Sequence, residues 1–172
     1  MVLDLNTMSV NSKPGSHTQL TYKEKDYWVK EIEMHLTEEN YELDSNTIIF
    51  DEEEYQKLQN KVDWIPKLLE YKCIKNKHIW KYANIEGLID RKKRDYYQNM
   101  KDFGKYFLGE FVPYMLNYET KNDMYFFHID PGVGNFNFTT NGFCVLEPNN
   151  WQWVTEDKFH RIVRYAIQKF VK

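Results

Sequence analysis

The sequence predicts an α+β fold with small antiparallel sheets, and three observations lead to this prediction. Residues 15–34 read as two strands joined by a charged turn. Residues 92–118 carry apolar side chains at steps of three and four, which is the spacing of one helix face, and Pro113 is expected to kink that helix. Residues 135–146 read as strand, turn and strand, with Asn141-Gly142 as the hairpin signal.

Local signals predict the remaining elements in chain order. Asp51 suits the N-cap of a helix, because the glutamates at 52–54 are favourable near the positive end of the helix dipole. Residues 64–71 and 77–82 are expected to form two more strands. Residues 156–171 have the apolar period of a C-terminal helix.

Chemistry-bearing residues concentrate in the segment His-Ile-Asp-Pro-Gly-Val-Gly-Asn that begins at His128. Asp130 and Asn135 are separated by Pro-Gly-Val-Gly, which cannot continue a helix or strand and must form a tight loop. Such a loop can direct both side chains at one point. Glu147 leaves the second strand of the following hairpin near the place where Asn135 enters the first. Two carboxylates and an amide oxygen suit a hard cation, Mg²⁺ above all.

This pattern resembles the catalytic loop and metal-binding strand of the protein-kinase-like superfamily, H-x-D-x-x-x-x-N followed by an acidic residue. It is most similar to the atypical branches, namely aminoglycoside and choline phosphotransferases, lipopolysaccharide kinases and RIO-type kinases. By this resemblance Asp130 accepts or orients the proton of the attacking hydroxyl, His128 braces the loop, and Asn135 and Glu147 bind the metal. The chain departs from the family pattern in that Glu147 replaces an Asp, and Pro-Asn follows it in place of Phe-Gly.

The resemblance implies further residues in the first half of the chain. Lys30, in Trp-Val-Lys on the second predicted strand, would contact the α- and β-phosphates of ATP; Lys25 is a poorer choice because it falls in the turn. Glu54 would pair with Lys30, with Glu53 as the fallback.

Two other regions would contact the nucleotide. Gly15 and Ser16 form the one glycine-bearing stretch before Lys30 and would cover the phosphates loosely, since no G-x-G-x-x-G is present there. Backbone groups around Tyr82 and Ala83 would form the hinge that receives the adenine.

The fold that the resemblance implies is a two-lobe kinase-like domain, with a small antiparallel sheet and one helix at residues 15–82 and a truncated helical lobe at 83–172. Residues 1–14 are polar and lack a clear period, so a flexible N-terminus is expected. The expected function is transfer of the γ-phosphoryl group of ATP to a hydroxyl of a protein or small molecule. Mg²⁺ is the expected metal, with Mn²⁺ as a second choice.

The composition limits the classes of binding partner and the cellular location that are expected. The 172 residues carry a formal charge of −3, which gives no electrostatic case for nucleic acid. The basic run 91–94 is expected to be the solvated start of a helix. Two cysteines, Cys73 and Cys144, are too few for a disulfide framework or a zinc site, and no signal peptide or membrane span is evident, so a cytoplasmic location is expected.

Alternative hypotheses remain open at this point. His128, Asp130 and the distant His160, followed by Arg164, resemble the facial triad of Fe(II) and 2-oxoglutarate oxygenases, although few strands separate them. A catalytically weak pseudokinase, or a non-enzymatic immunity or regulatory binding protein, would also fit, because Glu147 replaces the usual Asp and the glycine loop is sparse.

Overall fold

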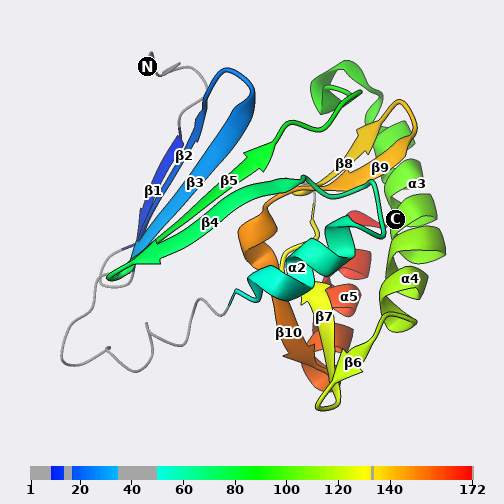
Figure 1. Cartoon of the computed structure of the whole chain (residues 1–172). Coiled ribbons are helices and arrows are strands. Elements are labelled where there is room, and N and C mark those ends of the chain that lie inside the picture. Colours follow the sequence, from blue (N-terminus) through cyan, green and yellow to red (C-terminus); the bar gives the residue numbers. More distant parts are fainter. Residues whose placement is uncertain (1–8, 14–16, 35–49, 133, 172) are drawn as a thin grey trace. The chain divides into compact units, whose positions relative to one another are not determined.

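The computed structural model describes residues 9–13, 17–34, 50–132 and 134–171. The chain divides into two compact units. Unit 1 contains the described residues up to Val62 together with 66–84, and unit 2 contains Asp63–Ile65 with 85–171. The described residues mix small antiparallel sheets with helices, so the α+β prediction is confirmed (Figure 1).

Unit 1 is built on a five-stranded antiparallel sheet with the strand order β1-β2-β3-β5-β4. Its strands are β1 (Ser9–Lys13), β2 (His17–Lys23), β3 (Tyr27–Met34), β4 (Leu68–Ile74) and β5 (Lys77–Ala83). The hairpin predicted over residues 15–34 is confirmed from His17 onwards, because β2 and β3 pair antiparallel around the turn at residues 24–26. Ser9–Lys13, within the segment 1–14 for which a flexible N-terminus is expected, pair with β2; residues 1–8 and 14 lie outside the described residues.

Helix α2 (Glu52–Gln59) connects β3 to β4 and packs on the sheet of unit 1. The predicted N-cap is confirmed, since the Asp51 carboxylate accepts the Glu54 backbone N–H at 3.0 Å. Two side chains fix the helix to the start of β4: the Tyr55 hydroxyl donates to the Pro66 carbonyl at 2.6 Å, and the Leu68 N–H donates to Gln59 Oε1 at 2.8 Å.

The helical segment of unit 2 follows a short 3-10 turn, η2 (Arg91–Lys93), and consists of α3 (Tyr96–Tyr106), the π-helical η3 (Phe107–Phe111) and α4 (Val112–Leu116). The amphipathic helix predicted over 92–118 is therefore present, with a change of winding inside it. The π-helical turn lies directly before Pro113, whose ring nitrogen cannot donate a helical hydrogen bond, so the irregularity falls where the sequence predicted a kink.

The strands of unit 2 form two small antiparallel sheets, β10-β7-β6 and β8-β9 (Figure 1). Their bounds are β6 (Thr120–Lys121), β7 (Met124–His128), β8 (Phe136–Thr139), β9 (Gly142–Val145) and β10 (Trp151–Thr155), with a 3-10 turn η4 (Pro148–Asn150) and the C-terminal helix α5 (Glu156–Phe170). The strands β6 and β10 were not predicted. The predicted hairpin is confirmed with its turn at residues 139–142: Thr139 pairs with Gly142, so Thr140 and Asn141 are the two central residues, and Gly142 of the Asn-Gly signal already belongs to the second strand.

The interior of unit 2 is aromatic, as the 17% aromatic content of the chain suggested. Phe111 is fully buried and its ring lies 5.3–6.1 Å from those of Phe127, Phe136 and Trp151. Phe136 stacks on Phe143 across the β8–β9 pair, with ring centroids 5.1 Å apart. This packing gives β8 a fixed position, and β8 begins one residue after Asn135.

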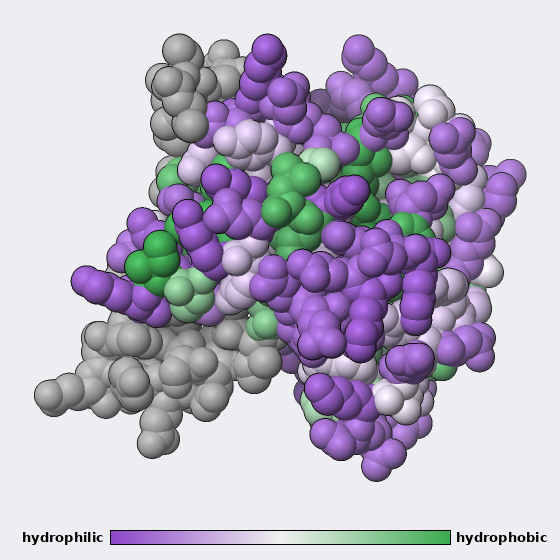
Figure 2. All heavy atoms as spheres, viewed as in Figure 1, coloured by the Kyte–Doolittle hydropathy of each residue, from purple (hydrophilic) through white to green (hydrophobic). Residues whose placement is uncertain are grey.

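The face of the molecule in Figure 2 is largely hydrophilic, with hydrophobic residues in small groups. This agrees with the mean hydropathy of −0.73. No helix in the described part of the chain is both long enough and apolar enough to cross a membrane.

Candidate functional site

His128, the last residue of β7, is fully buried and uses both ring nitrogens in hydrogen bonds. The Asp130 backbone N–H donates to Nδ1 at 3.1 Å, so the ring proton is on Nε2, which lies 2.8 Å from the Leu146 carbonyl and donates to it. Burial lowers the pKa of His128 to about 4, so the ring stays neutral in this position. The imidazole is thus a brace, and neither nitrogen is left to bind iron as the oxygenase hypothesis requires.

Asp130 and Asn135 are brought together by the loop between them. The turn closes when the N–H groups of Asn135 and Phe136 donate to the Gly132 carbonyl at 2.9 and 2.8 Å. The Asn135 amide nitrogen then donates to the Asp130 carbonyl at 2.9 Å and lies 3.4 Å from its carboxylate oxygen Oδ2. Because the nitrogen of this amide contacts Asp130, its oxygen is the atom with the chemistry of a cation ligand. The Asp130 residue is exposed, as a group that meets a substrate must be.

Leu146 connects this loop to the end of β9 through its backbone. Its N–H donates to the Asn135 carbonyl at 2.7 Å, while its carbonyl accepts a hydrogen bond from His128 Nε2–H. The two backbone hydrogen bonds of Leu146 therefore fix the backbone directly before Glu147. The predicted approach of Glu147 to the point where Asn135 enters β8 is confirmed at the level of the backbone.

Glu147 adopts the left-handed conformation, with φ 67° and ψ 76°. This conformation costs a non-glycine residue roughly 1–2 kcal/mol. Hydrogen bonds on either side maintain it: those of Leu146 before it, and after it the Asn150 N–H, which donates to the Glu147 carbonyl at 3.0 Å. The Asn150 carbonyl in turn accepts the Ile129 N–H at 2.9 Å, which connects this turn to the start of the loop after β7.

The side-chain amide of Asn149, two residues after Glu147, has an oxygen that accepts no hydrogen bond from the described residues. Asn149 is buried and its amide nitrogen donates to Asn150 Oδ1 at 3.2 Å, but its own Oδ1 has no hydrogen-bond partner among the described residues. Leaving such a group unpaired costs about 1–3 kcal/mol. An oxygen of this kind near Glu147 is compatible with a hard cation, which takes oxygen ligands.

No group of three or more His, Cys, Asp or Glu side chains suited to a metal occurs in the part of the chain that the structure describes. Mg²⁺ bound to a nucleotide does not need three or more protein ligands. It is commonly held by one or two carboxylates together with phosphate oxygens. The oxygens of Asn135 and Glu147 fit that smaller requirement.

Lys30 and Glu54 are both buried in unit 1, each only 8% exposed. Lys30 lies in the middle of the sheet, where it pairs with Thr21 on β2 and Trp80 on β5. Directly paired residues share a face of an antiparallel sheet. Since the Trp80 ring contacts Phe50, just before α2, at 5.6 Å, Lys30 lies on the sheet face that α2 and its Glu54 cover.

Four other residues were expected to contact the nucleotide: Gly15, Ser16, Tyr82 and Ala83. Gly15 and Ser16 lie outside the described residues. Tyr82 is buried in β5 between β3 and β4. The Ala83 N–H donates to the Lys67 carbonyl at 2.9 Å, so it is used within the sheet and cannot also donate to an adenine; the backbone leaves the sheet at Asn84.

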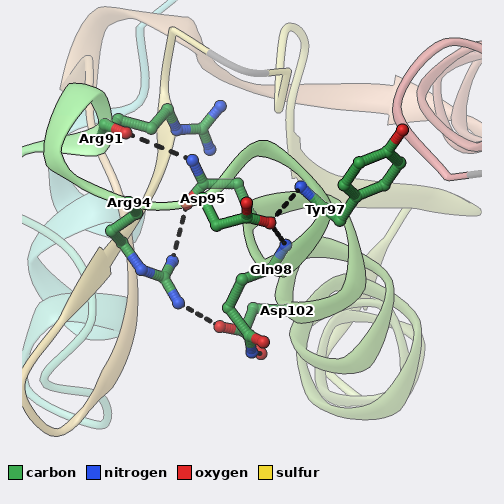
Figure 3. A network of polar contacts seen from close by, with 7 residues as sticks. Arg91, Arg94, Asp95, Tyr97, Gln98 and Asp102 are labelled. Carbon is green, nitrogen blue, oxygen red and sulfur yellow. Dashed lines mark hydrogen bonds and ion pairs between the residues drawn. The ribbon is translucent and has the colours of Figure 1, made fainter.

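The basic run 91–94 is only partly solvated, which corrects the prediction of a solvated helix start. Figure 3 shows Arg94 directed at Asp102 of α3, with which it forms an ion pair. Arg94 also donates to Asn99 Oδ1 at 2.9 Å. The Asp95 carboxylate caps α3 by accepting the N–H groups of Tyr97 and Gln98 (Figure 3).

Arg91 reaches from the same run to the candidate site. Its guanidinium donates to the carbonyl of Phe136, the residue after Asn135, and its own carbonyl accepts the Asn99 amide at 3.2 Å. Sequence reasoning missed this role because a cluster of four basic residues is typical of a solvated surface. It also missed Leu146, whose contribution is made by backbone atoms that no side-chain pattern signals.

The candidate groups thus form two sets, each described within its own unit. Unit 1 holds Lys30 and Glu54 on one sheet face, and unit 2 holds Asp130, Asn135 and Glu147 on a hydrogen-bonded frame. No protein-family model matches the chain, and no curated protein matches it.

Proposed function

We propose that this protein is an ATP-dependent phosphotransferase that moves the γ-phosphoryl group to a hydroxyl acceptor. The observation that carries the proposal is the frame in unit 2, in which the buried His128 ring and the backbone of Leu146 hold the backbone at Asp130 and Asn135 and lead directly into Glu147. His128 binds Asp130 on one side and Leu146 on the other, and Leu146 binds Asn135. A frame of this kind fixes a reacting geometry before substrate arrives.

Each side chain of the frame has a role in this reaction. The exposed Asp130 carboxylate would orient the acceptor hydroxyl and receive its proton. Asn135 Oδ1 and the Glu147 carboxylate would hold Mg²⁺, which supplies charge neutralisation between phosphate oxygens when bound. His128, neutral and buried, would keep the loop in one conformation.

Unit 1 supplies the residues proposed to bind the phosphates. Buried lysine and glutamate side chains are almost always paired. Glu54 forms an ion pair with Lys57 at 3.8 Å within α2, and Lys30 lies on the sheet face that α2 covers, which supports Lys30 as a second partner of Glu54. Lys30 would then contact the α- and β-phosphates. The strand order and the helix between β3 and β4 support this assignment, because they put the lysine in a central strand and the acid on the connecting helix.

Melting temperature with and without MgATP tests nucleotide binding. A ligand at about 100 times its Kd stabilises a protein by about 2.7 kcal/mol, which corresponds to a shift of several degrees at this chain length. We expect such a shift with Mg²⁺ and ATP, and its loss in Lys30→Ala. Lys25→Ala is the matched control, since Lys25 is exposed in the turn before the same strand, and it should keep the shift.

Asp130→Asn separates binding from transfer. We expect this variant to keep the MgATP shift and to lose phosphoryl transfer, measured by mass spectrometry of products or by ADP release. Transfer at the unchanged rate would show that Asp130 is not the residue that orients the acceptor.

A catalytically weak pseudokinase or regulatory binding protein is the second candidate, and one observation favours it. Glu147 occupies its position in a left-handed conformation and is followed by the rigid Pro148 and the buried Asn149, which limits how its longer carboxylate can adjust to a metal. Nucleotide binding without any ADP release across a broad set of acceptors would select this alternative.

A further inference from the structure

A cavity of about 300 Å³ opens beside Asp130, wholly within unit 2. Its walls come from the loop after β7 and from one face of α5. Asp130 lies at the loop side, and Lys158, Arg161, Ile162, Ala166 and Phe170 contribute from α5. The cavity therefore joins the proposed acceptor-orienting carboxylate to a surface that the mechanism described above does not use.

The charged groups of this cavity favour an anion. Lys158 and Arg161 lie three residues apart on α5, so they project from the same helix face. Against these two cations the cavity contains one carboxylate, that of Asp130. Arg161 also contacts Asp157 through Nε at 3.3 Å, but this pair is exposed and a guanidinium has further N–H groups to donate.

Apart from Tyr165, the remaining α5 residues that line the cavity are apolar. Ala166 is buried, and Ile162 and Phe170 present partly exposed hydrocarbon to the cavity. Gly132 allows Phe170 to approach the loop, because a Cβ at that position would lie 2.7 Å from the ring carbon Cε2. The absence of a side chain at Gly132 thus lets the aromatic ring bound the cavity beside the loop.

We infer that the phosphoryl acceptor is a small anionic alcohol with an apolar frame, bound in this cavity with its hydroxyl at Asp130 and its anionic group at Arg161 and Lys158. This inference rests on the proposed phosphotransferase function. In the reaction the acceptor oxygen forms a bond to the γ-phosphorus, the bond from that phosphorus to the β,γ-bridging oxygen breaks, ADP leaves, and the hydroxyl proton passes to Asp130.

The size of the cavity favours a small molecule over a peptide. Sites for small ligands run from about 300 to 1,000 Å³, and this one is at the lower limit. A ligand of one ring with two substituents fits such a volume, with the ring against Ile162 and Phe170.

Binding of para- and meta-(hydroxymethyl)benzoate, measured by calorimetry or ligand-observed NMR on the full chain, tests the inference. Benzyl alcohol is the neutral counterpart and para-(aminomethyl)benzyl alcohol the cationic one. We expect at least one benzoate to bind about tenfold more tightly than either counterpart, as one charge-assisted contact would give. The same benzoate should accept phosphate from MgATP.

Two charge reversals on α5 locate the anion. Arg161→Glu should remove the preference for the benzoate. Arg164→Glu makes the same change one turn away, at an exposed residue that does not line the cavity, and should leave the preference intact. Equal loss in both variants would mean that the overall charge of the helix attracts the anion, and would overturn the inference.

The remaining outcomes distinguish an error in the acceptor class from an error in the proposed function. If neither benzoate binds better than benzyl alcohol while the MgATP melting shift persists, the acceptor class is wrong and the phosphotransferase proposal stands. If MgATP gives no shift, the proposed function fails irrespective of the benzoates. Binding of an acidic serine peptide in place of the benzoates would overturn the small-molecule acceptor.

Discussion

At the scale of single residues, His128 is the side chain on which the candidate site depends most. It is fully buried and joins two chain segments by accepting the Asp130 N–H and donating to the Leu146 carbonyl. Both partners are backbone groups, so they remain polar whatever replaces the ring. Removing the imidazole leaves both groups without this partner at a partly buried position.

We predict that His128→Phe lowers the free energy of unfolding by about 2–4 kcal/mol, because a donor and an acceptor lose their partners. Urea unfolding followed by tryptophan fluorescence measures the change. His160→Phe is the control, since the His160 side chain is 58% exposed on α5, and it should change stability by about 0.5 kcal/mol or less. Comparable losses in the two variants would contradict the bracing role.

Glu147→Gln is predicted to weaken metal binding without unfolding the protein. The amide keeps the size and the backbone conformation but removes the charge that a hard cation prefers. The Mg²⁺ concentration that gives half of the ATP-dependent melting shift should rise by about tenfold or more. Glu119→Gln, at an exposed position between α4 and β6, should leave that concentration unchanged, and an equal effect of the two substitutions would argue against Glu147 as a ligand.

At the scale of elements, the segment before α3 holds β8 in place from one side. The Ile89 N–H donates to the Phe138 carbonyl at 2.9 Å, the Thr140 N–H donates to the Gly87 carbonyl at 2.9 Å, and Arg91 reaches the Phe136 carbonyl. These contacts follow β8 along most of its length. They bear on the candidate site because β8 starts immediately after Asn135.

Gly87→Ala is predicted to loosen this segment. Gly87 has φ +72°, and a Cβ there would lie 2.5 Å from Thr140 Oγ1, so the substitution adds backbone strain to a steric clash. We expect a loss of stability above about 1 kcal/mol and faster hydrogen exchange at the Thr140 amide. Gly109→Ala is the matched control, because a Cβ there meets nothing within 4 Å and lies in a helical turn, and it should stabilise by up to about 1 kcal/mol.

At the scale of the whole molecule, stability should fall in mild acid. The pKa of His128 falls from 6.5 to about 4 on burial, so below pH 6.5 the unfolded chain takes up a proton that the folded chain does not. Stability therefore decreases as the pH falls from 6.5 towards 4. Between about pH 7 and about pH 5 the predicted loss is about 2 kcal/mol.

Urea titrations at these two pH values measure the loss, and the same titrations on His128→Phe provide the control. The variant should lack this part of the pH dependence, because its side chain cannot take up a proton in either state. An unchanged pH dependence in the variant would show that other groups are responsible.

Much of the fold was predictable because its signals are local. The β2–β3 hairpin, the Asp51 cap of α2, the interruption at Pro113 and the loop between Asp130 and Asn135 each depend on residues close together in sequence. The strands that the sequence did not predict depend on pairing over distance. Ser9–Lys13 have no strong strand pattern and pair with the edge of β2, and β10 pairs with the edge of β7.

By itself the sequence determined which chemical groups the protein carries and the tight turn that joins two of them, since Pro and Gly restrict the backbone wherever they occur. Tertiary structure alone decided that both nitrogens of His128 are occupied, that the Ala83 N–H belongs to the sheet, and that a cavity with two cations lies beside Asp130. These outcomes depend on which distant backbone groups and helix faces meet. The packing of the whole chain into a dense interior decides which of these groups meet. Residues close together in the sequence do not carry that information.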